Sequence, residues 1–301
     1  MHTGNTPANI KARSPLAVIG EWTEMIKLEH TVFALPFALS GLILASPQAL
    51  PSGATVFFTV LAFVGARSAA MTLNRVIDAG MDKANPRTKD RAIPAGRIKP
   101  ALAMVFALLS FALMLFAASK LPLICLQLSP IAVVWLSFYS FTKRFTWLCH
   151  LVLGIALGGA ALGGWVAAAG AINGVAPWLL ALAVSTWVAG FDVIYACQDF
   201  SFDTSEKVFS IPARFGIARA LLISRGLHAV TIANLLALGL SLHLGVFYWL
   251  GFTSVLAMLI YEHSLVKADD LSKVNAAFFN VNGMVSIACF FTILLDKIIK
   301  F

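Results

Sequence analysis

Charged residues are scarce in this chain. Asp, Glu, Lys and Arg make up only 12% of its 301 residues, whereas a soluble domain typically carries about 25%. Hydrophobic residues make up 59%, and the mean hydropathy is +0.86. A chain of this composition has too few polar side chains to cover a soluble globule. It therefore predicts an all-α protein that crosses a membrane several times.

Cysteine is scarce as well. The four cysteines lie scattered in apolar segments, and their spacings match neither a disulfide framework nor a metal site. Packing in the core is the role that we expect for them. The polar stretch 1–14 lacks the apolar centre of a secretory signal peptide, so we expect none.

Long apolar segments are abundant. A helix that crosses a bilayer needs about 20 mostly apolar residues. Nine segments approach or reach that length, and they are 31–49, 54–73, 101–119, 121–141, 149–171, 175–197, 220–242, 246–265 and 275–296. We therefore expect about nine transmembrane helices in one bundle, forming a single domain over 1–301.

The net charge of +8 is not spread evenly over the connections between these segments. Basic residues gather in the N-terminal leader and after the second, fourth, sixth and eighth segments. The other four connections together carry one lysine. The positive-inside rule then places the N-terminus and the charged connections on the cytoplasmic side. The C-terminal "DKIIKF" falls outside, where its two lysines run against the rule.

The stretch "NRVIDAGMDKANPRTKDRAIPAG" (74–96) follows the second apolar segment without a break. Asn74, Asp78 and Asp82 are four residues apart, which places them on one stripe of a helix that continues the span. Carboxylates one turn apart repel each other, and a cation would offset that repulsion. Oxygen ligands of this kind suit Mg²⁺, which also takes phosphate oxygens of a substrate.

Basic residues follow these acids directly. A proline at position 86 should end or kink the helix. Arg87, Lys89 and Arg91 come within the next five residues. Acids that hold Mg²⁺, followed by bases that hold phosphate, are a combination that suits a diphosphate.

A second acidic cluster repeats this arrangement. In "GFDVIYACQDFSFDTSEK", Asp192, Tyr195, Asp199 and Asp203 lie on one helical face that leaves the sixth segment. The two clusters suggest a weak internal repeat of two four-helix halves, followed by a ninth helix. Two facing clusters could hold two or three Mg²⁺ ions around one diphosphate and make it a good leaving group.

A third element lies between the two clusters. "SFYSFTKRFTW" places Tyr139, Lys143 and Arg144 at the cytoplasmic end of the fourth segment. These side chains could close the diphosphate site from a third side.

These three motifs together resemble those of the UbiA-type membrane prenyltransferases. The first is similar to N-x-x-x-D-x-x-x-D with a trailing R-T-x-x-R-x-x-P, and the second to D-x-x-Y-x-x-x-D-x-x-x-D. "YSFTKRFT" resembles the family's Tyr…Lys-Arg element, and the number of apolar segments matches its nine helices. One small departure is "KDRAIPAG", where many members have Arg and Pro adjacent. The stretches "IKLEHTVFALPFA" and "GARSAAMTLNR" look most like those of 4-hydroxybenzoate polyprenyltransferases and of similar enzymes that prenylate a dihydroxynaphthoate.

The resemblance implies a helical bundle around a central cavity that opens sideways to lipid. It implies transfer of a polyprenyl group from its diphosphate to a small aromatic acid, most simply 4-hydroxybenzoate in ubiquinone synthesis. A dihydroxynaphthoate of menaquinone synthesis is the alternative acceptor. The implied Mg²⁺ ligands are Asn74, Asp78, Asp82, Asp199 and Asp203.

The chemistry of this transfer suggests further roles. A base that takes the phenol proton would make the ring a better nucleophile, and Asp192, deeper than the metal cluster, is our candidate. Arg67 lies on the same helical face as Asn74, and a charged group inside a span needs a partner. That partner is either the carboxylate of the aromatic acid or an acid of the protein that Arg67 merely braces. Lys27 is a competing anchor for the substrate carboxylate. We expect Tyr195, like Arg67 and Lys27, to contact the aromatic acid.

Other interpretations remain open at this stage. Intramembrane acids on two helices also occur in ion-coupled transporters, although here they gather at one membrane face. A lipid-binding scaffold without catalysis is a third possibility. Four histidines have no evident partner in the sequence and receive no role: His150, His228, His243 and His263. We expect the bacterial inner membrane as the location, membrane lipid as a partner and no nucleic acid.

Overall fold

The computed structural model describes residues 15–27 and 31–300. The N-terminal stretch 1–14, for which we expect no signal peptide, lies outside the described residues. Within this part of the chain the regular elements are helices, apart from one isolated bridge between Lys267 and Asp270. In chain order they are α1 (Pro15–Met25), α2 (Thr31–Ala45), α3 (Gly53–Ile77), α4 (Ala79–Ala84), α5 (Pro100–Ala118), α6 (Leu123–Thr142), α7 (Cys149–Ala169), α8 (Ala176–Ala196), the 3₁₀ turn η2 (Cys197–Asp199), α9 (Phe200–Ser205), α10 (Ile211–Phe215), α11 (Ile217–Ser241), α12 (Val246–Leu265), the π-helical turn η3 (Ala276–Val281) and α13 (Asn282–Lys300).

Each of the nine predicted segments corresponds to a long helix. Among the described residues, seven helices are long and apolar enough to cross a membrane, counting α8 to α9 and η3 to α13 as one each. The apolar part of α2, Phe33–Ala45, is shorter, and α12 is not among the seven. The prediction of an all-helical membrane protein is confirmed, whereas the count of nine spans stays a prediction.

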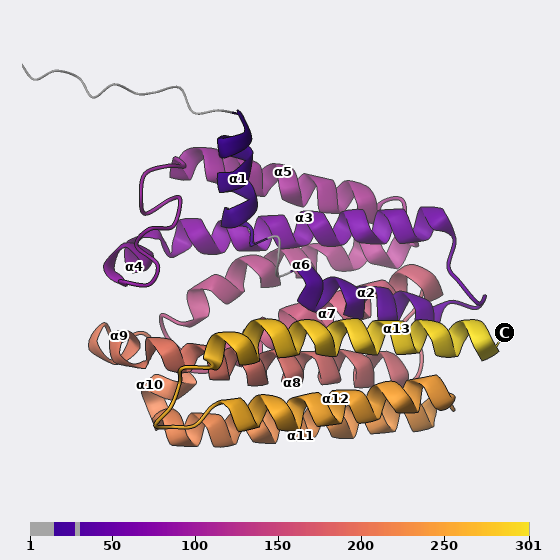
Figure 1. Ribbon diagram of the computed structural model, residues 1–301. Helices are drawn as coiled ribbons and strands as arrows, with labels where there is room; N and C mark the ends of the chain where they lie inside the picture. The colour runs from indigo at the N-terminus through magenta and orange to yellow at the C-terminus, as the bar shows by residue number, and fades with distance from the viewer. Residues whose placement is uncertain (1–14, 28–30, 301) are drawn as a thin grey trace, which may run out of the picture.

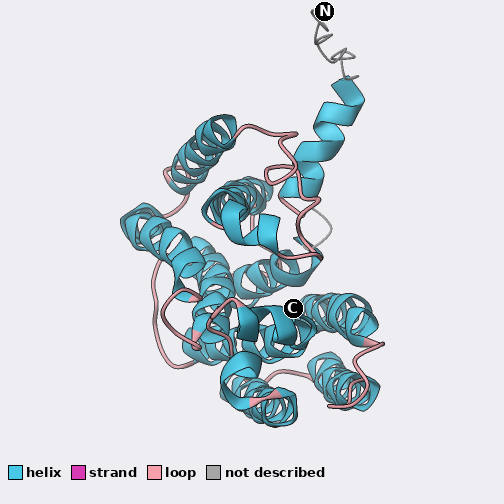
Figure 2. Cartoon of the chain, turned by 90° about the vertical axis from the view of Figure 1, so that its left-hand side faces the viewer, coloured by secondary structure: helices cyan, strands magenta, loops and turns pink. Residues whose placement is uncertain are grey.

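The long helices run side by side along one direction, and α1 stands across them (Figures 1 and 2). At the centre α7 packs against α8 and α2. Glycines permit this close approach: a Cβ on Gly154 would lie 2.1 Å from the carbonyl oxygen of Ser185, and one on Gly164 would press on the backbone of Ala38. The glycine-rich stretch 154–164 is therefore a helix-packing face, as small residues in membrane helices commonly are.

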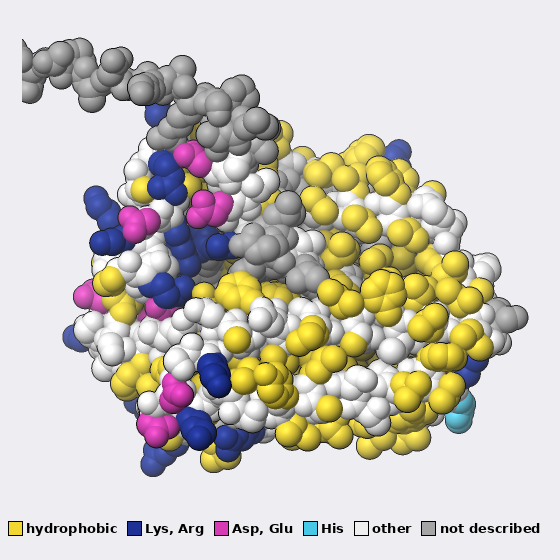
Figure 3. Space-filling model, in the orientation of Figure 1, with side chains coloured by type: hydrophobic (Ala, Val, Ile, Leu, Met, Phe, Trp, Pro, Cys, Tyr) yellow, Lys and Arg dark blue, Asp and Glu magenta, His cyan; other side chains and the backbone are white. Residues whose placement is uncertain are grey.

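The outer surface is divided between charge and apolar side chains. Lys, Arg, Asp and Glu gather at the end of the molecule that carries α4 and α9, whereas hydrophobic side chains cover most of the remaining face (Figure 3). Large apolar side chains such as Leu109, Val134 and Leu222 are more than 60% exposed. Apolar groups that face outward along the helices fit contact with lipid and not with water.

Candidate active site

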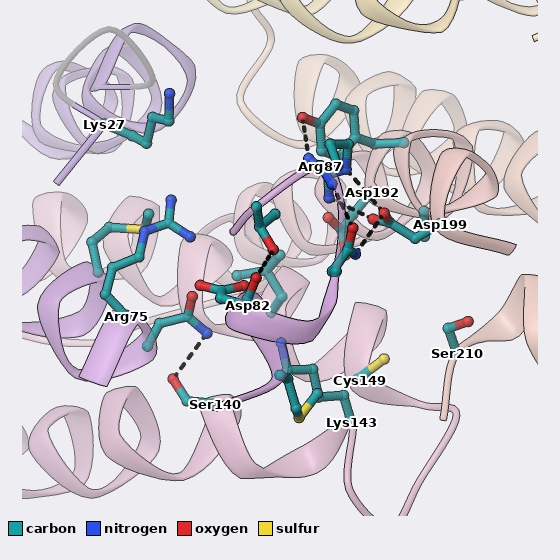
Figure 4. Close-up of a pocket in the computed structure, with 18 of the residues that line it drawn as sticks. Lys27, Arg75, Asp82, Arg87, Ser140, Lys143, Cys149, Asp192, Asp199 and Ser210 are labelled. Atoms are coloured by element: carbon teal, nitrogen blue, oxygen red, sulfur yellow. Dashed lines mark hydrogen bonds and ion pairs between the residues drawn. The ribbon is translucent and has the colours of Figure 1, made fainter. Parts of the chain in front are cut away.

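A cavity of about 540 Å³ lies at the charged end of the bundle and receives side chains from both acidic clusters. Twelve of the residues selected from the sequence line it: Lys27, Arg67, Asn74, Asp82, Arg87, Arg91, Tyr139, Lys143, Asp192, Tyr195, Asp199 and Asp203. In Figure 4, Lys27 and Arg75 lie on one side of Asp82, while Asp192 and Asp199 lie on the other. Segments more than a hundred residues apart in the sequence therefore meet on one cavity.

Three selected residues do not line this cavity. Asp78 and Arg144 lie just behind it. Asp78 contacts Asn74 and Lys143, which line the cavity, and Arg144 contacts Asp78. Lys89 is exposed on the surface of the loop after α4. The cavity thus includes most of the motif residues but leaves two predicted diphosphate ligands, Lys89 and Arg144, outside its lining.

The first acidic cluster sits where α3 passes into α4. We expected one continuous helix here, but α3 ends at Ile77 and Asp78 joins it to the six-residue α4. The four-residue spacing survives because the N–H of Asp78 donates to the carbonyl of Asn74 (2.9 Å) and that of Asp82 to the carbonyl of Asp78 (2.8 Å). Helix α4 ends at Ala84, two residues before the proline, as the sequence predicts.

Asp78 is buried and forms ion pairs with two basic side chains. Its Oδ2 lies 2.6 Å from the Nζ of Lys143, and its Oδ1 lies 3.2 Å from Nη1 of Arg144. The side-chain amide of Asn74 also donates to Oδ2 at 2.8 Å and to the hydroxyl of Ser140 at 3.4 Å. The end of α6 is thereby bound to the end of α3, so the Tyr…Lys-Arg element does meet the first cluster.

Asp82 is buried but only half satisfied. Its Oδ1 accepts a hydrogen bond from Nη1 of Arg91 at 2.7 Å. Its Oδ2 is buried and has no hydrogen-bond partner. A buried carboxylate oxygen without a partner is costly for a protein to maintain. Since Asp82 lines the cavity, this oxygen is available to accept a hydrogen bond from a ligand or to coordinate a metal ion.

The second acidic cluster has the same local construction as the first. Helix α8 ends at Ala196, η2 forms the joint, and the six-residue α9 follows. Asp199 lies at the joint, as Asp78 does, and Asp203 is the fourth residue of α9, as Asp82 is of α4. Both long helices therefore present one acid at the joint and a second, buried acid one turn later.

Arg87 connects the two clusters. Its Nε and Nη2 donate to the two carboxylate oxygens of Asp199 at 2.9 and 2.5 Å, a bidentate pair. The side-chain Oδ1 of Asn85 accepts the backbone N–H of Arg87 at 2.9 Å, and its Nδ2 donates to Asp199 at 3.2 Å. Partial burial lowers the pKa of Arg87, but its contacts with Asp199 more than offset this and leave the pKa raised. The loop after α4 is thus bound to η2 at the end of α8.

Tyr195 completes this connection. Its hydroxyl oxygen accepts a hydrogen bond from Nη1 of Arg87 at 3.2 Å, and the guanidinium lies 5.3 Å from the ring centroid. This distance is in the range of a cation–π contact. The ring of Tyr195 therefore forms part of the cavity wall beside the Arg87–Asp199 pair.

Asp192 has a partner that the sequence did not reveal. The buried His150, at the start of α7, lies with Nδ1 2.7 Å from Oδ2 of Asp192. The backbone N–H of Ile211 donates to Nε2 of the same ring at 3.3 Å. An amide N–H can only donate, so Nε2 is the acceptor and Nδ1 carries the proton toward Asp192. Sequence offered no signal for this pair, because the two residues are 42 positions apart.

The predicted anchors for the aromatic acid lie on the α1 side of the cavity. Nη2 of Arg67 donates to the main-chain carbonyl of Lys27 at 3.2 Å. Tyr139 donates its hydroxyl proton to the carbonyl of Ala70 at 3.2 Å. Arg75, which we did not select, is buried, lines the cavity and points Nε at the carbonyl of Met25. Its place inside a span was a signal for it, because a charged residue there needs a purpose.

Among the described residues, no group of three or more His, Cys, Asp or Glu side chains is arranged to hold a metal ion. Three of the acids are instead paired with bases: Asp78 with Lys143 and Arg144, Asp82 with Arg91, and Asp199 with Arg87. The predicted metal ligands and the predicted diphosphate ligands therefore bind each other.

Comparison with known proteins agrees with the motifs. The UbiA prenyltransferase family matches over residues 34–284. The chain is 30% identical to a 4-hydroxybenzoate octaprenyltransferase of Chromohalobacter salexigens, over 87% of this chain and 84% of that protein. It is 31% identical to the enzyme of the same name from Vibrio atlanticus, over 90% of this chain and 95% of that protein.

Solved structures show the same fold. The apo structure of a UbiA homologue from Aeropyrum pernix K1 is 34% identical, with a TM-score of 0.81, and covers 89% of this chain and 98% of that one. A UbiA homologue from Archaeoglobus fulgidus, bound to DMAPP and Mg²⁺, has a TM-score of 0.72 at 19% identity and covers 93% of this chain and all of that one. On the strength of the matched family region and these relatives, the chain belongs to the UbiA prenyltransferase family.

Proposed function

We propose that this chain transfers a polyprenyl group from its diphosphate to a small aromatic acid, with 4-hydroxybenzoate as the first candidate. The observation that carries the proposal is the meeting of both acidic clusters and the basic loop on one cavity. The relatives named as 4-hydroxybenzoate octaprenyltransferases support the choice of acceptor. We place the site on the cytoplasmic side of a bacterial inner membrane, which the one-sided charge supports.

The similar construction of the two clusters supports a further proposal on organisation. A long helix, an acid at a joint and a six-residue helix with a second acid occur once in each half. We interpret 1–301 as one domain of two related four-helix halves and a ninth helix. The site then lies between the halves, where each contributes one cluster.

The diphosphate would exchange partners with the acids. Arg87, Arg91 and Lys143 line the cavity, and Arg144 stands behind it. When these cations turn to diphosphate oxygens, the acids lose their counter-charges. Lys89 is exposed and outside the cavity, so it would reach the diphosphate only if the loop moved. Tyr139 forms part of the cavity wall.

Mg²⁺ fits the acids that are released in this exchange. Asn74, Asp78, Asp82, Asp199 and Asp203 supply oxygen ligands, which Mg²⁺ prefers. The unpartnered Oδ2 of Asp82 is a donor already in place. Bound Mg²⁺ would withdraw charge from the diphosphate and so make it a better leaving group.

Asp192 is the proposed base for the acceptor. Nδ1 of His150 lies 2.7 Å from one of its oxygens, and Asp192 lines the cavity. The carboxylate of the aromatic acid would face the basic side chains of Arg67 and Lys27, with the ring near Tyr195. In this proposed arrangement the phenol proton would face Asp192 and the acid group would face the α1 side.

The proposed reaction conserves electrons and protons. The allylic C–O bond breaks, and its electron pair leaves with the diphosphate. Asp192 takes the phenol proton, and the ring carbon ortho to that oxygen forms a bond to the allylic carbon. The proton on that ring carbon is lost and the phenol is re-protonated, so one proton is released with the diphosphate. Apolar walls exclude the water that would otherwise capture the allylic cation.

Product analysis tests this proposal. The purified protein would be incubated in detergent with Mg²⁺, geranyl or farnesyl diphosphate, and a mixture of 4-hydroxybenzoate, 1,4-dihydroxy-2-naphthoate and 1,4-dihydroxy-6-naphthoate. We expect prenylated 4-hydroxybenzoate by mass spectrometry and none from Asp78→Ala. A prenylated naphthoate would replace only the acceptor. No product and no diphosphate release would overturn the proposal.

A further inference from the structure

A second polar cluster lies buried among the helices behind the aromatic wall of the cavity. Glu262 is fully buried in the last turn of α12, and Asn282 is fully buried at the start of α13. The indole of Trp187 from α8 and the rings of His228 and His263 complete the cluster. Polar groups inside a membrane protein are costly and commonly serve function. None of the roles assigned so far uses this cluster.

Asn282 is the centre of this cluster. Its Nδ2 donates to Oε1 of Glu262 at 2.8 Å and to the carbonyls of Ala277 and Phe278 at 3.1 and 3.3 Å. Its Oδ1 accepts the indole N–H of Trp187 at 2.8 Å. An indole can only donate and a carbonyl can only accept, so the amide has one possible orientation. Asn282 therefore joins α8, α12 and two carbonyls of the π-helical turn η3.

The π-helical turn is itself unusual. Such turns are rare and often occur at functional sites, because they widen the helix and leave carbonyls without their normal partners. Here the amide of Asn282 supplies partners for two of these carbonyls. The turn carries Phe278 and Phe279, which both line the cavity. The backbone that Asn282 holds is thus the backbone that presents two aromatic side chains to the site.

Phe278 transmits this position to the charged part of the site. Its ring centroid lies 4.1 Å from that of Tyr195, at an interplanar angle of 31°. It also meets Phe33 and Phe191 edge-on at 5.5 and 5.3 Å. Tyr195 in turn accepts the hydrogen bond of Arg87, which pairs with Asp199. Contacts therefore continue from Glu262 to the arginine proposed to bind the diphosphate.

The ring of His228 packs beside the carboxylate of Glu262. Oε2 of Glu262 has no hydrogen-bond partner and lies 3.7 Å from Nδ1 of His228. The same nitrogen lies 3.0 Å from Nε2 of His263, and Nε2 of His228 lies 3.2 Å from the carbonyl of Trp187. A Cβ on Gly190 would lie 2.3 Å from this imidazole, so the ring rests directly on α8. Four helices meet in this cluster with little room to shift.

We propose that Glu262 and Asn282 are positioning residues for the transfer reaction. Glu262 orients Asn282, Asn282 fixes the π-helical turn, and Phe278 on that turn supports Tyr195 and Arg87 at the diphosphate. The inference rests on the proposed function, because it assigns a kinetic role at the same site. It adds that the geometry of this site is held by a hydrogen-bonded cluster that touches no substrate.

Two substitutions at one position test the role of Glu262. Glu262→Gln keeps an oxygen that accepts from Asn282, whereas Glu262→Leu is similar in size and removes it. We expect Glu262→Leu to lower kcat/KM for the prenyl diphosphate by about 10-fold to 100-fold, the scale of a small misplacement of reacting groups. We expect Glu262→Gln to stay within about threefold of the wild type.

A double-mutant cycle distinguishes positioning from a loss of stability. Asn282→Ser and Phe278→Leu would be combined, and kcat/KM measured for each single and double variant on monodisperse protein. If Asn282 acts through Phe278, the double variant is no worse than about twofold below the poorer single variant. Asp296→Asn, a buried polar substitution on the same helix α13 but at its far end, is the matched control and should combine with Phe278→Leu additively.

The outcomes separate this inference from the proposed function. A wild-type protein that transfers no prenyl group would refute the proposed function. An active wild type with unchanged kinetics in Glu262→Leu would refute this inference alone. If Glu262→Leu does not fold, the cycle with Asn282→Ser decides, and additive effects of Asn282→Ser and Phe278→Leu would overturn the positioning role.

Discussion

The two acidic clusters are alike in sequence and local construction, but they differ in burial and in their partners. The side chains of Asp78 and Asp82 are 1% and 7% exposed, whereas those of Asp192 and Asp199 are 24% and 17% exposed, and only Asp203 of the second cluster is buried. The first cluster is held by cations from α6 and from the loop after α4. The second is held by Arg87 from the loop after α4 and by His150 from α7.

This difference suggests a division of roles between the clusters. A buried acid between two cations cannot lose them without a replacement, because an unpaired charge would remain in a poorly solvated place; its partners would therefore exchange only as Mg²⁺ takes their place. The more open acids have partners that can be exchanged or that leave one oxygen free. We infer that the first cluster is a rigid anchor for metal and diphosphate, while the second closes over the donor and faces the acceptor.

The largest effect should come from the anchor. Asp78→Ala removes a proposed metal ligand and leaves Lys143 and Arg144 without their common partner. We expect kcat/KM to fall by at least about 1,000-fold, as when a main electrostatic element of a site is lost. Steady-state turnover of prenyl diphosphate measures this. A fall of less than tenfold, with the fold intact, would contradict the anchoring role.

A smaller effect should follow at the bridge between the clusters. Arg87→Leu removes the bidentate pair with Asp199 and the hydrogen bond to Tyr195. We expect the KM for the prenyl diphosphate to rise by about 10-fold to 100-fold, with a smaller change in kcat. Lys89→Leu, in the same loop but exposed, is the control and should stay within about twofold. Equal effects of both variants would indicate only a loss of positive charge.

The acceptor side should respond through kcat. His150→Ala leaves Asp192 without its donor, and we expect kcat to fall by about 10-fold while the KM for the prenyl diphosphate stays unchanged. His150→Gln can donate to Asp192 and accept from Ile211, so it should recover most of that loss. The same loss in both variants would argue that the histidine only fills space.

The smallest effect on catalysis should occur at the opposite end of the molecule. Asp296 in α13 accepts the backbone N–H of Gly245 at 2.7 Å and so caps the start of α12. Asp296 also accepts the N–H of Tyr248 at 3.4 Å, and Asp296→Asn keeps only one of the two oxygen acceptors, so it should lower the free energy of unfolding by about 1 kcal/mol. Thermal unfolding in detergent measures this loss, and kcat/KM should not change. A kinetic effect comparable to that of His150→Ala would show that the two ends are coupled.

The sequence was sufficient to predict the helical class and most residues that meet on the cavity. Apolar length determines the helices, and the four-residue spacing places Asn74, Asp78 and Asp82 on one face, so both survive the break at Asp78. The spacing could not reveal that break. Nor could it reveal that the acids pair with the bases, because charge balance depends on which helix ends meet.

Partners distant in the sequence were the main omission. The roles that we propose for His150, Glu262 and Asn282 each depend on a contact with a residue of another helix. The C-terminal lysines gave a different lesson, since they run against the positive-inside rule. Lys297 donates to the carbonyl of Ser46 at 2.8 Å and Lys300 to that of His243, so each binds a carbonyl just past the C-terminal end of a helix. Local hydrogen bonding thus accounts for a charge that topology alone did not.

The most direct test of the central claim measures acceptor-dependent diphosphate release with one variant from each cluster. Wild type, Asp78→Ala and Asp199→Ala would be compared with Mg²⁺ and with EDTA. If one diphosphate is bound between both clusters, the wild type releases diphosphate only with Mg²⁺, and each variant loses that activity. Full activity in either variant, or release by the wild type in EDTA, would contradict the account.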